Sequence, residues 1–83
     1  MAGYHLISIP KGEIGEISKI QEEVLELEDA FKQGAKIMAL CELSDLYGAM
    51  EAFIERHHPG STMKDIRKMS KLTRRSFKVG ERR

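Results

Sequence analysis

Two acidic stretches decide the fold of this chain: KIQEEVLELEDA at residues 19–30 and ALCELSDLYGAMEAF at residues 39–53. Around each of them, apolar side chains recur every three or four residues, which is the spacing of one face of an α-helix. In the first segment these positions are Ile17, Ile20, Val24, Leu27 and Phe31, and in the second they are Ala39, Leu43, Leu46, Met50 and Ile54. We therefore expect two long helices, over residues 14–33 and 35–57, with stripes centred near Val24, Phe31 and Met50 facing the core.

Glycine and proline residues mark the ends of these helices. Gly34 separates the two segments, and the sequence HPG at residues 58–60 follows the second, so both places favour a turn. Thr62 and Asp65 have a spacing close to that of a capping box, which opens a third predicted helix over residues 62–78.

The remaining segments lie at the two ends of the chain. Residues 1–12 form a predicted extended arm, and residues 79–83 form a predicted loose tail. The expected fold is all-α, in one domain of residues 1–83: an antiparallel helical hairpin about Gly34 plus a third C-terminal helix.

Length limits the architecture further. The 83 residues, about 9.5 kDa, suffice for one small domain and exclude a multidomain enzyme. A chain of about 80 residues buries only around 60% of its unfolded surface, so domains of this size often gain stability by association. We therefore expect a homodimer in the form of a helical bundle, with a tetramer left open.

Cysteine usage and hydropathy indicate the compartment. The single cysteine, Cys41, cannot form a disulfide within the chain, which favours a reducing environment, and its apolar neighbours predict a core side chain. No segment resembles a signal peptide, and none approaches the roughly 20 apolar residues that a membrane span requires. The expected location is the cytoplasm, with no membrane partner.

The formal net charge of +1 conceals an asymmetric distribution. Residues 1–55 carry four basic and eleven acidic side chains, a net −7, whereas residues 56–83 carry ten basic and two acidic ones, a net +8. Such asymmetry fits either an acidic body with a basic arm for nucleic acid or a membrane, or a site where a cation and a polyanion meet.

Four of the acidic residues occupy corresponding places in the two long helices. Glu23 and Glu42 each lie about 80° from the apolar stripe in the same rotational sense, with Glu26 and Asp45 beyond them. On antiparallel helices that face each other, offsets of equal sense lie along one groove. Both pairs are also equally distant from Gly34, so we expect the four carboxylates to converge about 14 Å from the turn.

Converging carboxylates repel one another unless a cation neutralises them. An all-oxygen donor set suits Mg²⁺, with Mn²⁺ as a substitute, and Mg²⁺ commonly completes its coordination with substrate phosphates. The alternative interpretation is an ordinary solvated helix face, which is the environment expected for Glu22, Glu28, Asp29, Glu51 and Glu55.

The two stretches resemble the MazG-like all-α nucleoside triphosphate pyrophosphohydrolases, whose pattern is ExxE, a spacer, then ExxD. Here the pattern is Glu23-x-x-Glu26 and Glu42-x-x-Asp45, within a resemblance that covers residues 14–55. The C-terminal string KMSKLTRRSFKVGERR is similar to the end of short phage-encoded members, for which the location would be the host cytoplasm. The resemblance implies a helical homodimer, Mg²⁺ dependence, and cleavage of a nucleotide between its α and β phosphates to release a monophosphate and pyrophosphate.

Residue roles follow from that hypothesis. Glu23, Glu26, Glu42 and Asp45 are the expected metal ligands, and Glu22 or Glu26 is the candidate general base. Lys19 either contacts a phosphate or forms a surface ion pair with Glu23. The basic third segment supplies further candidates for phosphate binding: Lys71, Arg74, Arg75, Lys78 and Arg82.

Two other functions compete with this one. A small dimeric nucleic-acid-binding or regulatory protein would use the basic third helix and need no metal, although the four-carboxylate pattern makes nucleic acid the less expected partner. A dimerisation module without activity is the third hypothesis. His5 carries no functional signal by itself.

Overall fold

The structure, a computed structural model, describes residues 5–78, with side chains up to residue 74. This part of the chain is all-α and contains no strand. It forms three helices: α1 (Ile17–Lys32), α2 (Lys36–His57) and α3 (Met63–Lys78). Residues 5–13 have no regular secondary structure, and the predicted tail at residues 79–83 lies outside the described residues.

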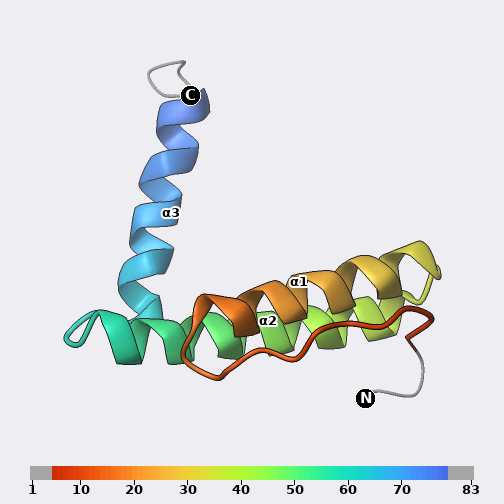
Figure 1. The fold of residues 1–83 in the computed structure, drawn as a ribbon. Coiled ribbons are helices and arrows are strands. Elements are labelled where there is room, and N and C mark those ends of the chain that lie inside the picture. The colour runs from red at the N-terminus through yellow and green to blue at the C-terminus, as the bar shows by residue number, and fades with distance from the viewer. Residues whose placement is uncertain (1–4, 79–83) are drawn as a thin grey trace.

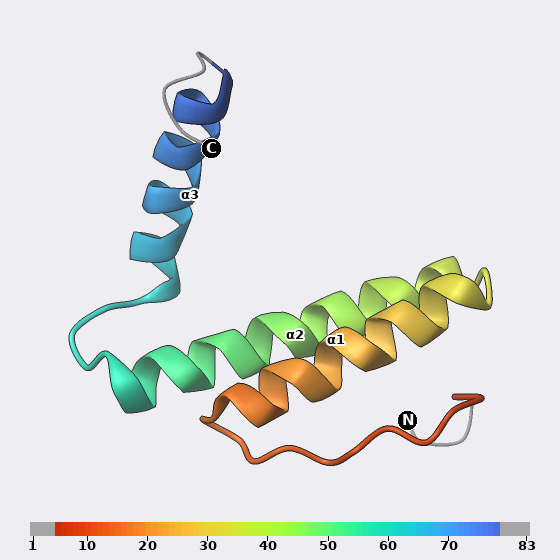
Figure 2. The same cartoon turned by 45° about the horizontal axis from the view of Figure 1, so that its top comes forward.

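Helices α1 and α2 lie side by side and run in opposite directions (Figures 1 and 2). The turn between them is short because Gly34 has a φ of +73°, which glycine adopts without strain. The Gly34 N–H donates to the carbonyl of Phe31 at 3.0 Å, and the Ala35 N–H donates to the carbonyl of Ala30 at 3.1 Å. This pair of bonds is a Schellman motif, which satisfies the last carbonyls of α1.

Helix α1 begins at Ile17, three residues later than the predicted start at residue 14. Gly15 interrupts the helix because its φ is +91°. The side chain of Arg56, in the last turn of α2, packs against Gly15 and lies 3.2 Å from Glu13 and 3.1 Å from Glu16. These contacts hold the start of α1 against the end of α2.

The arm of residues 5–13 runs alongside α1 in the opposite direction (Figure 2). Two backbone N–H groups attach it: Leu6 donates to Asp29 Oδ2 at 3.2 Å, and Gly12 donates to Glu22 Oε1 at 2.8 Å. The arm therefore covers one side of α1.

Helix α3 projects away from the α1 and α2 pair (Figure 1). Its start carries the predicted capping box: the Thr62 N–H donates to Asp65 Oδ2 at 2.8 Å, and the Asp65 N–H donates to Thr62 Oγ1 at 3.4 Å. None of the helices in the described range combines the length and apolar character that a membrane crossing requires.

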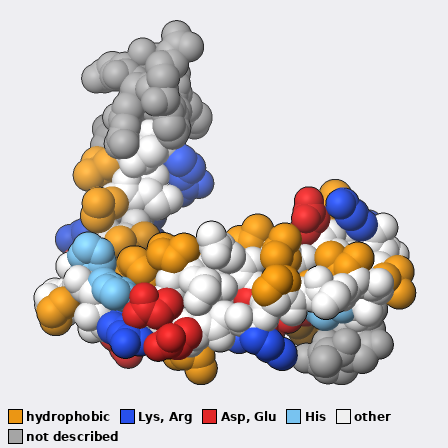
Figure 3. Space-filling model, in the orientation of Figure 1, with side chains coloured by type: hydrophobic (Ala, Val, Ile, Leu, Met, Phe, Trp, Pro, Cys, Tyr) orange, Lys and Arg blue, Asp and Glu red, His pale blue; other side chains and the backbone are white. Residues whose placement is uncertain are grey.

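The apolar core of a single chain is small. Among the described hydrophobic residues, only Ala30, Ala49 and Ile54 are buried. Val24 and Phe31, at the centre of the predicted apolar stripe, are 46% and 76% exposed, so the core of a single chain does not cover them. Figure 3 shows hydrophobic side chains gathered on the surface over α1 and α2.

Cys41 is exposed, so its predicted place in the core is also wrong. It lies on α2, and helical position rather than the character of its sequence neighbours sets the exposure of its side chain. Four acidic side chains of the described part of the chain are buried instead: Glu22, Glu23, Asp29 and Glu42.

Candidate metal centre

Two helices bring four carboxylates together. Glu23 and Glu26 project from α1 and Glu42 and Asp45 from α2, and each offers an oxygen that lies within 4.8 Å of the others. Because the ExxE and ExxD spacings place both members of each pair on one helix face, the antiparallel packing of α1 and α2 is sufficient to make the pairs meet. We call these four residues the carboxylate cluster.

The cluster is buried at one side and open at the other. Glu23 and Glu42 are 4% and 2% exposed, Glu26 is half-buried, and Asp45 is exposed. Oε1 of Glu23 is buried without a hydrogen-bond partner among the described residues. A buried carboxylate oxygen that no donor satisfies is unfavourable, and a bound cation would satisfy it.

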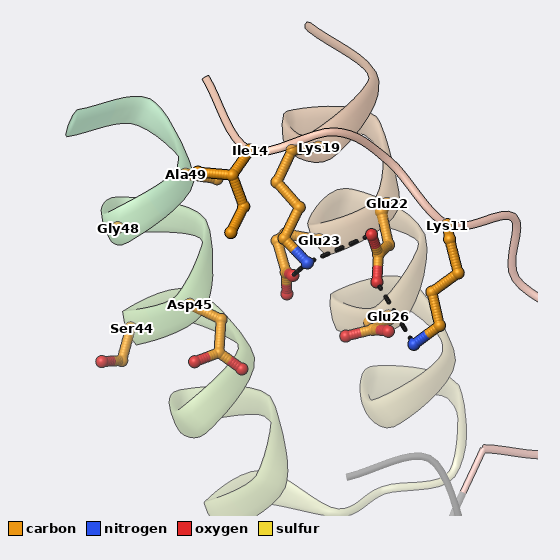
Figure 4. Close-up of a pocket in the computed structure, with 10 residues that line it drawn as sticks. All are labelled: Lys11, Ile14, Lys19, Glu22, Glu23, Glu26, Ser44, Asp45, Gly48 and Ala49. Carbon is orange, nitrogen blue, oxygen red and sulfur yellow. Dashed lines mark hydrogen bonds and ion pairs between the residues drawn. The ribbon is translucent and has the colours of Figure 1, made fainter. Parts of the chain in front are cut away.

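Lys19 supplies a positive charge at the edge of the cluster. Its Nζ lies 3.1 Å from Glu22 Oε1 and 3.2 Å from Glu23 Oε2 (Figure 4). Burial lowers the pKa of Lys19, but the hydrogen bonds to both glutamates outweigh burial and raise it. Lys19 therefore pairs with Glu23, as one of its two predicted roles requires, but the two carboxylates that it contacts are buried and not at the surface. Its contact with a phosphate stays a prediction.

One lysine does not balance the cluster. Burial, followed by the negative charges of Glu23 and Glu42, raises the pKa of Glu26 to about 7. Near neutral pH the Glu26 carboxyl group is therefore protonated in part of the molecules, unless a bound cation displaces the proton.

Glu22 and Asp29 are both buried, so the expectation that they belong to a solvated face is wrong. The arm accounts for the difference because its backbone contacts both residues. Burial raises the pKa of Glu22, but the Gly12 N–H and Lys19 lower it by more than burial raises it. The pKa of Glu22 therefore lies below its usual value. Glu22 thus anchors the arm beside the cluster.

A cleft of about 460 Å³ opens beside the cluster, a volume within the usual range for small-molecule sites. Figure 4 shows carboxylates on both of its walls. Its other lining residues are Lys11, Ile14, Lys19, Ser44, Gly48 and Ala49. Lys11, which no sequence motif indicates, approaches Glu22 Oε2 at 4.0 Å.

The basic residues of α3 whose side chains the structure describes, up to Arg74, do not line this cleft. Lys71 and Arg74 are exposed on a helix that points away from it (Figure 1). The side chains of Arg75 and Lys78, and the whole of Arg82, lie outside the described residues. Their predicted role in phosphate binding stays a prediction.

His5 is a second residue at this site that sequence reasoning missed. Its ring is buried, with Nδ1 2.8 Å from Asp29 Oδ2 and Nε2 3.3 Å from Glu42 Oε2 and 4.0 Å from Glu26 Oε1. His5, Glu26 and Glu42 form a second group that could hold a metal ion. A lone histidine in a non-helical arm has no periodicity that would connect it with the helices.

Comparison of the chain with protein-family models, with curated proteins and with solved structures found no match. A proposal about function therefore depends on the geometry of the carboxylate cluster and on the spacing of the ExxE and ExxD motifs.

Proposed function

We propose that the protein is a Mg²⁺-dependent nucleoside triphosphate pyrophosphohydrolase of the MazG-like type. It would convert a ribo- or deoxyribonucleoside triphosphate and water into the monophosphate and pyrophosphate. The observation that carries the proposal is the meeting of Glu23, Glu26, Glu42 and Asp45 beside an open cleft. The ExxE and ExxD resemblance supplies the substrate class.

The donor set fits the proposed cation. The cluster offers only carboxylate oxygens, which Mg²⁺ and Mn²⁺ prefer, and one of these oxygens, Oε1 of Glu23, is buried without a partner among the described residues. All four residues of the cluster would serve as ligands. Bound Mg²⁺ would polarise the phosphate oxygens and stabilise the negative charge that develops on the leaving pyrophosphate.

Side chains of the protein would accept the proton of the attacking water and bind the phosphates of the nucleotide. Of the two candidate bases, Glu22 has Oε1 engaged by Gly12 and Lys19, and Lys11 lies 4.0 Å from its Oε2. We therefore assign the proton of the attacking water to Glu26, which would bind the metal through one oxygen and accept the proton on the other. Lys11 and Lys19 line the cleft and would attract the phosphates of the nucleotide.

The same proposal includes a homodimer. The exposed hydrophobic residues on α1 and α2 include Phe31, Ile37, Leu40, Leu43 and Tyr47. Three of them, Phe31, Leu40 and Leu43, line an apolar pocket of about 230 Å³ at the turn. A second copy packed on this surface would supply the core that one chain lacks.

Pyrophosphate release tests the activity directly. Standard and modified nucleoside triphosphates are incubated with the protein with and without Mg²⁺, and we expect metal-dependent release of pyrophosphate from at least one of them. Asp45→Asn should abolish the release without unfolding the chain because Asp45 is exposed. Glu51→Gln, at another exposed position of α2, is the matched control. Absence of pyrophosphate from every nucleotide, or full turnover by Asp45→Asn, would reject the proposal.

Helix α3 favours a second candidate, a nucleic-acid-binding protein. It projects from the body and exposes the basic residues Lys64, Arg67, Lys68, Lys71 and Arg74. This function predicts binding to DNA or RNA that needs no metal and weakens steeply with salt, by a slope that reflects the number of phosphate contacts. Fluorescence anisotropy with labelled duplex DNA and single-stranded RNA at several salt concentrations separates it from the enzyme.

A further inference from the structure

The hydrogen bond between His5 and Asp29 fixes the position of a proton. His5 Nδ1 lies 2.8 Å from Asp29 Oδ2. The same oxygen also accepts the Leu6 N–H at 3.2 Å and the Gln33 side-chain N–H at 2.9 Å. Because Asp29 Oδ2 acts as the acceptor in both of these bonds, the hydrogen of its bond to His5 lies on Nδ1.

The other ring nitrogen then faces two carboxylates. In a neutral imidazole whose Nδ1 carries the proton, Nε2 has a lone pair. This atom lies 3.3 Å from Glu42 Oε2 and 4.0 Å from Glu26 Oε1. Two ligands that each lie about 2.1 Å from one cation are separated by roughly 3.0–4.2 Å. Both distances from Nε2 therefore lie within the separation of two ligands of one cation. The three residues together offer ligand atoms that lie within 4.8 Å of one another.

We propose that His5, Glu26 and Glu42 form a second cation site that selects a divalent first-row transition metal over Mg²⁺. The site adjoins the carboxylate cluster and shares Glu26 and Glu42 with it. Its nitrogen ligand distinguishes it, since imidazole binds transition metals readily and Mg²⁺ prefers oxygen. Asp29 is a positioning residue, because a histidine that binds a metal usually donates its other N–H to a carboxylate or carbonyl.

This site has a consequence for the arm. His5 belongs to the arm, Glu26 to α1 and Glu42 to α2, so one ion would connect all three elements. The same arm carries Lys11, which lines the cleft, and Gly12, which binds Glu22. Occupancy of the second site would therefore hold the arm, and Lys11 with it, at the edge of the cleft. No nucleotide is needed for this binding, so the inference stands apart from the proposed hydrolysis.

The competing explanation is a doubly protonated His5 that only forms ion pairs with Asp29 and Glu42. Pulsed electron paramagnetic resonance separates the two explanations because it detects nitrogen bound directly to Mn²⁺. The full chain is titrated with Mn²⁺ in the absence of nucleotide, and we expect the spectrum to contain couplings from one imidazole nitrogen. Ion pairing alone predicts bound Mn²⁺ without such couplings.

Variants assign the nitrogen to a residue. The chain has three histidines, and the double variant His57→Gln/His58→Gln leaves only His5, so it should retain the couplings. His5→Gln should lose them and weaken Mn²⁺ binding about tenfold or more, while its affinity for Mg²⁺ stays nearly unchanged. Asp29→Asn should weaken Mn²⁺ binding while the nitrogen couplings persist, as expected of a residue that acts through His5.

Two results would overturn the inference: no nitrogen coupling in the double variant, or equal Mn²⁺ affinity in the wild type and His5→Gln. If His5→Gln fails to fold, as judged by circular dichroism, the double variant still decides the question because it changes only exposed histidines. Loss of pyrophosphohydrolase activity alone would not bear on this site, and loss of nitrogen coupling alone would not bear on the activity.

Discussion

Oε2 of Glu23 lies 3.2 Å from the ammonium group of Lys19, one turn earlier on α1. Oε1 of the same carboxylate is buried without a partner among the described residues. Lys19 therefore holds one oxygen of Glu23 in place, and the other oxygen remains available to a cation.

Replacing Lys19 with methionine should destabilise the fold. The substitution leaves Glu22 and Glu23 buried without their shared cation, and we expect a loss of about 1–3 kcal/mol in the free energy of unfolding, measured in urea without metal. Saturating Mg²⁺ should reduce this loss because the added cation takes over part of the lost attraction.

Lys32→Met is the matched control, since Lys32 forms a pair of the same spacing with Glu28 at 3.7 Å, with both side chains exposed. That variant should lose less than about 0.5 kcal/mol. Equal losses in the two variants would mean that the Lys19 pair contributes no more than a surface pair.

Stability without metal should fall as the pH rises from about 4.5 to about 7. The pKa of Glu26 is about 7 in the folded chain, raised from 4.5, so between these values the folded state binds more protons than the unfolded state. The free energy of unfolding therefore decreases with pH in this window. Glu22 and Asp29, whose pKa values are lowered, act in the opposite direction and at lower pH.

Urea unfolding at several pH values, with and without Mg²⁺, measures this dependence. Glu26→Gln should flatten the curve between pH 4.5 and 7, and Mg²⁺ should flatten it in the wild type because the ion competes with the proton. Glu28→Gln, at an exposed position of α1, should leave the curve unchanged.

The sequence was sufficient to predict the helices and the meeting of the carboxylates because both depend on local spacing. A period of 3.6 residues identifies α1 and α2, and Gly34 is equally distant from the two acidic pairs. The two acidic pairs then meet as soon as α1 and α2 pack against each other in opposite directions.

Features that depend on tertiary contacts could not be predicted in this way. The path of the arm is set by hydrogen bonds from Leu6 and Gly12 to two α1 carboxylates, and these bonds bury Asp29 and bring His5 to the cluster. Likewise, periodicity shows that one face of a helix is apolar but does not show what covers it. The apolar stripe therefore predicts that Phe31 faces a core, whereas its side chain is 76% exposed in a single chain.

The apolar surface predicts an effect on association. Leu40 is 67% exposed and lines the apolar pocket at the turn, so Leu40→Glu should place a charge within the proposed dimer interface. Sedimentation velocity should then show a monomer, whereas the wild type should sediment as a dimer. Leu72→Glu makes the same substitution at an exposed position of α3 and should leave the dimer intact. Equal dissociation by both variants would contradict the placement of the interface on α1 and α2.

We expect substitution by alanine to have opposite effects on the free energy of unfolding at Gly15 and at Gly48. Gly15 has a φ of +91°, and an added Cβ would lie 2.9 Å from Cδ of Arg56, which pairs with Glu13 and Glu16. Gly15→Ala should therefore lower the free energy of unfolding by about 1–2 kcal/mol through backbone strain and displacement of Arg56.

Gly48 lies in the middle of α2 with no atom within 4 Å of an added Cβ, so Gly48→Ala should raise the free energy of unfolding by about 0.5–1 kcal/mol. Urea unfolding of both variants measures the two effects. If Gly15→Ala is as stable as the wild type, the contact between Arg56 and the start of α1 does not constrain the backbone. Because Gly48 also lines the cleft, a change in the KM for nucleotide in the stabilised Gly48→Ala variant would indicate that the substrate contacts this wall of α2.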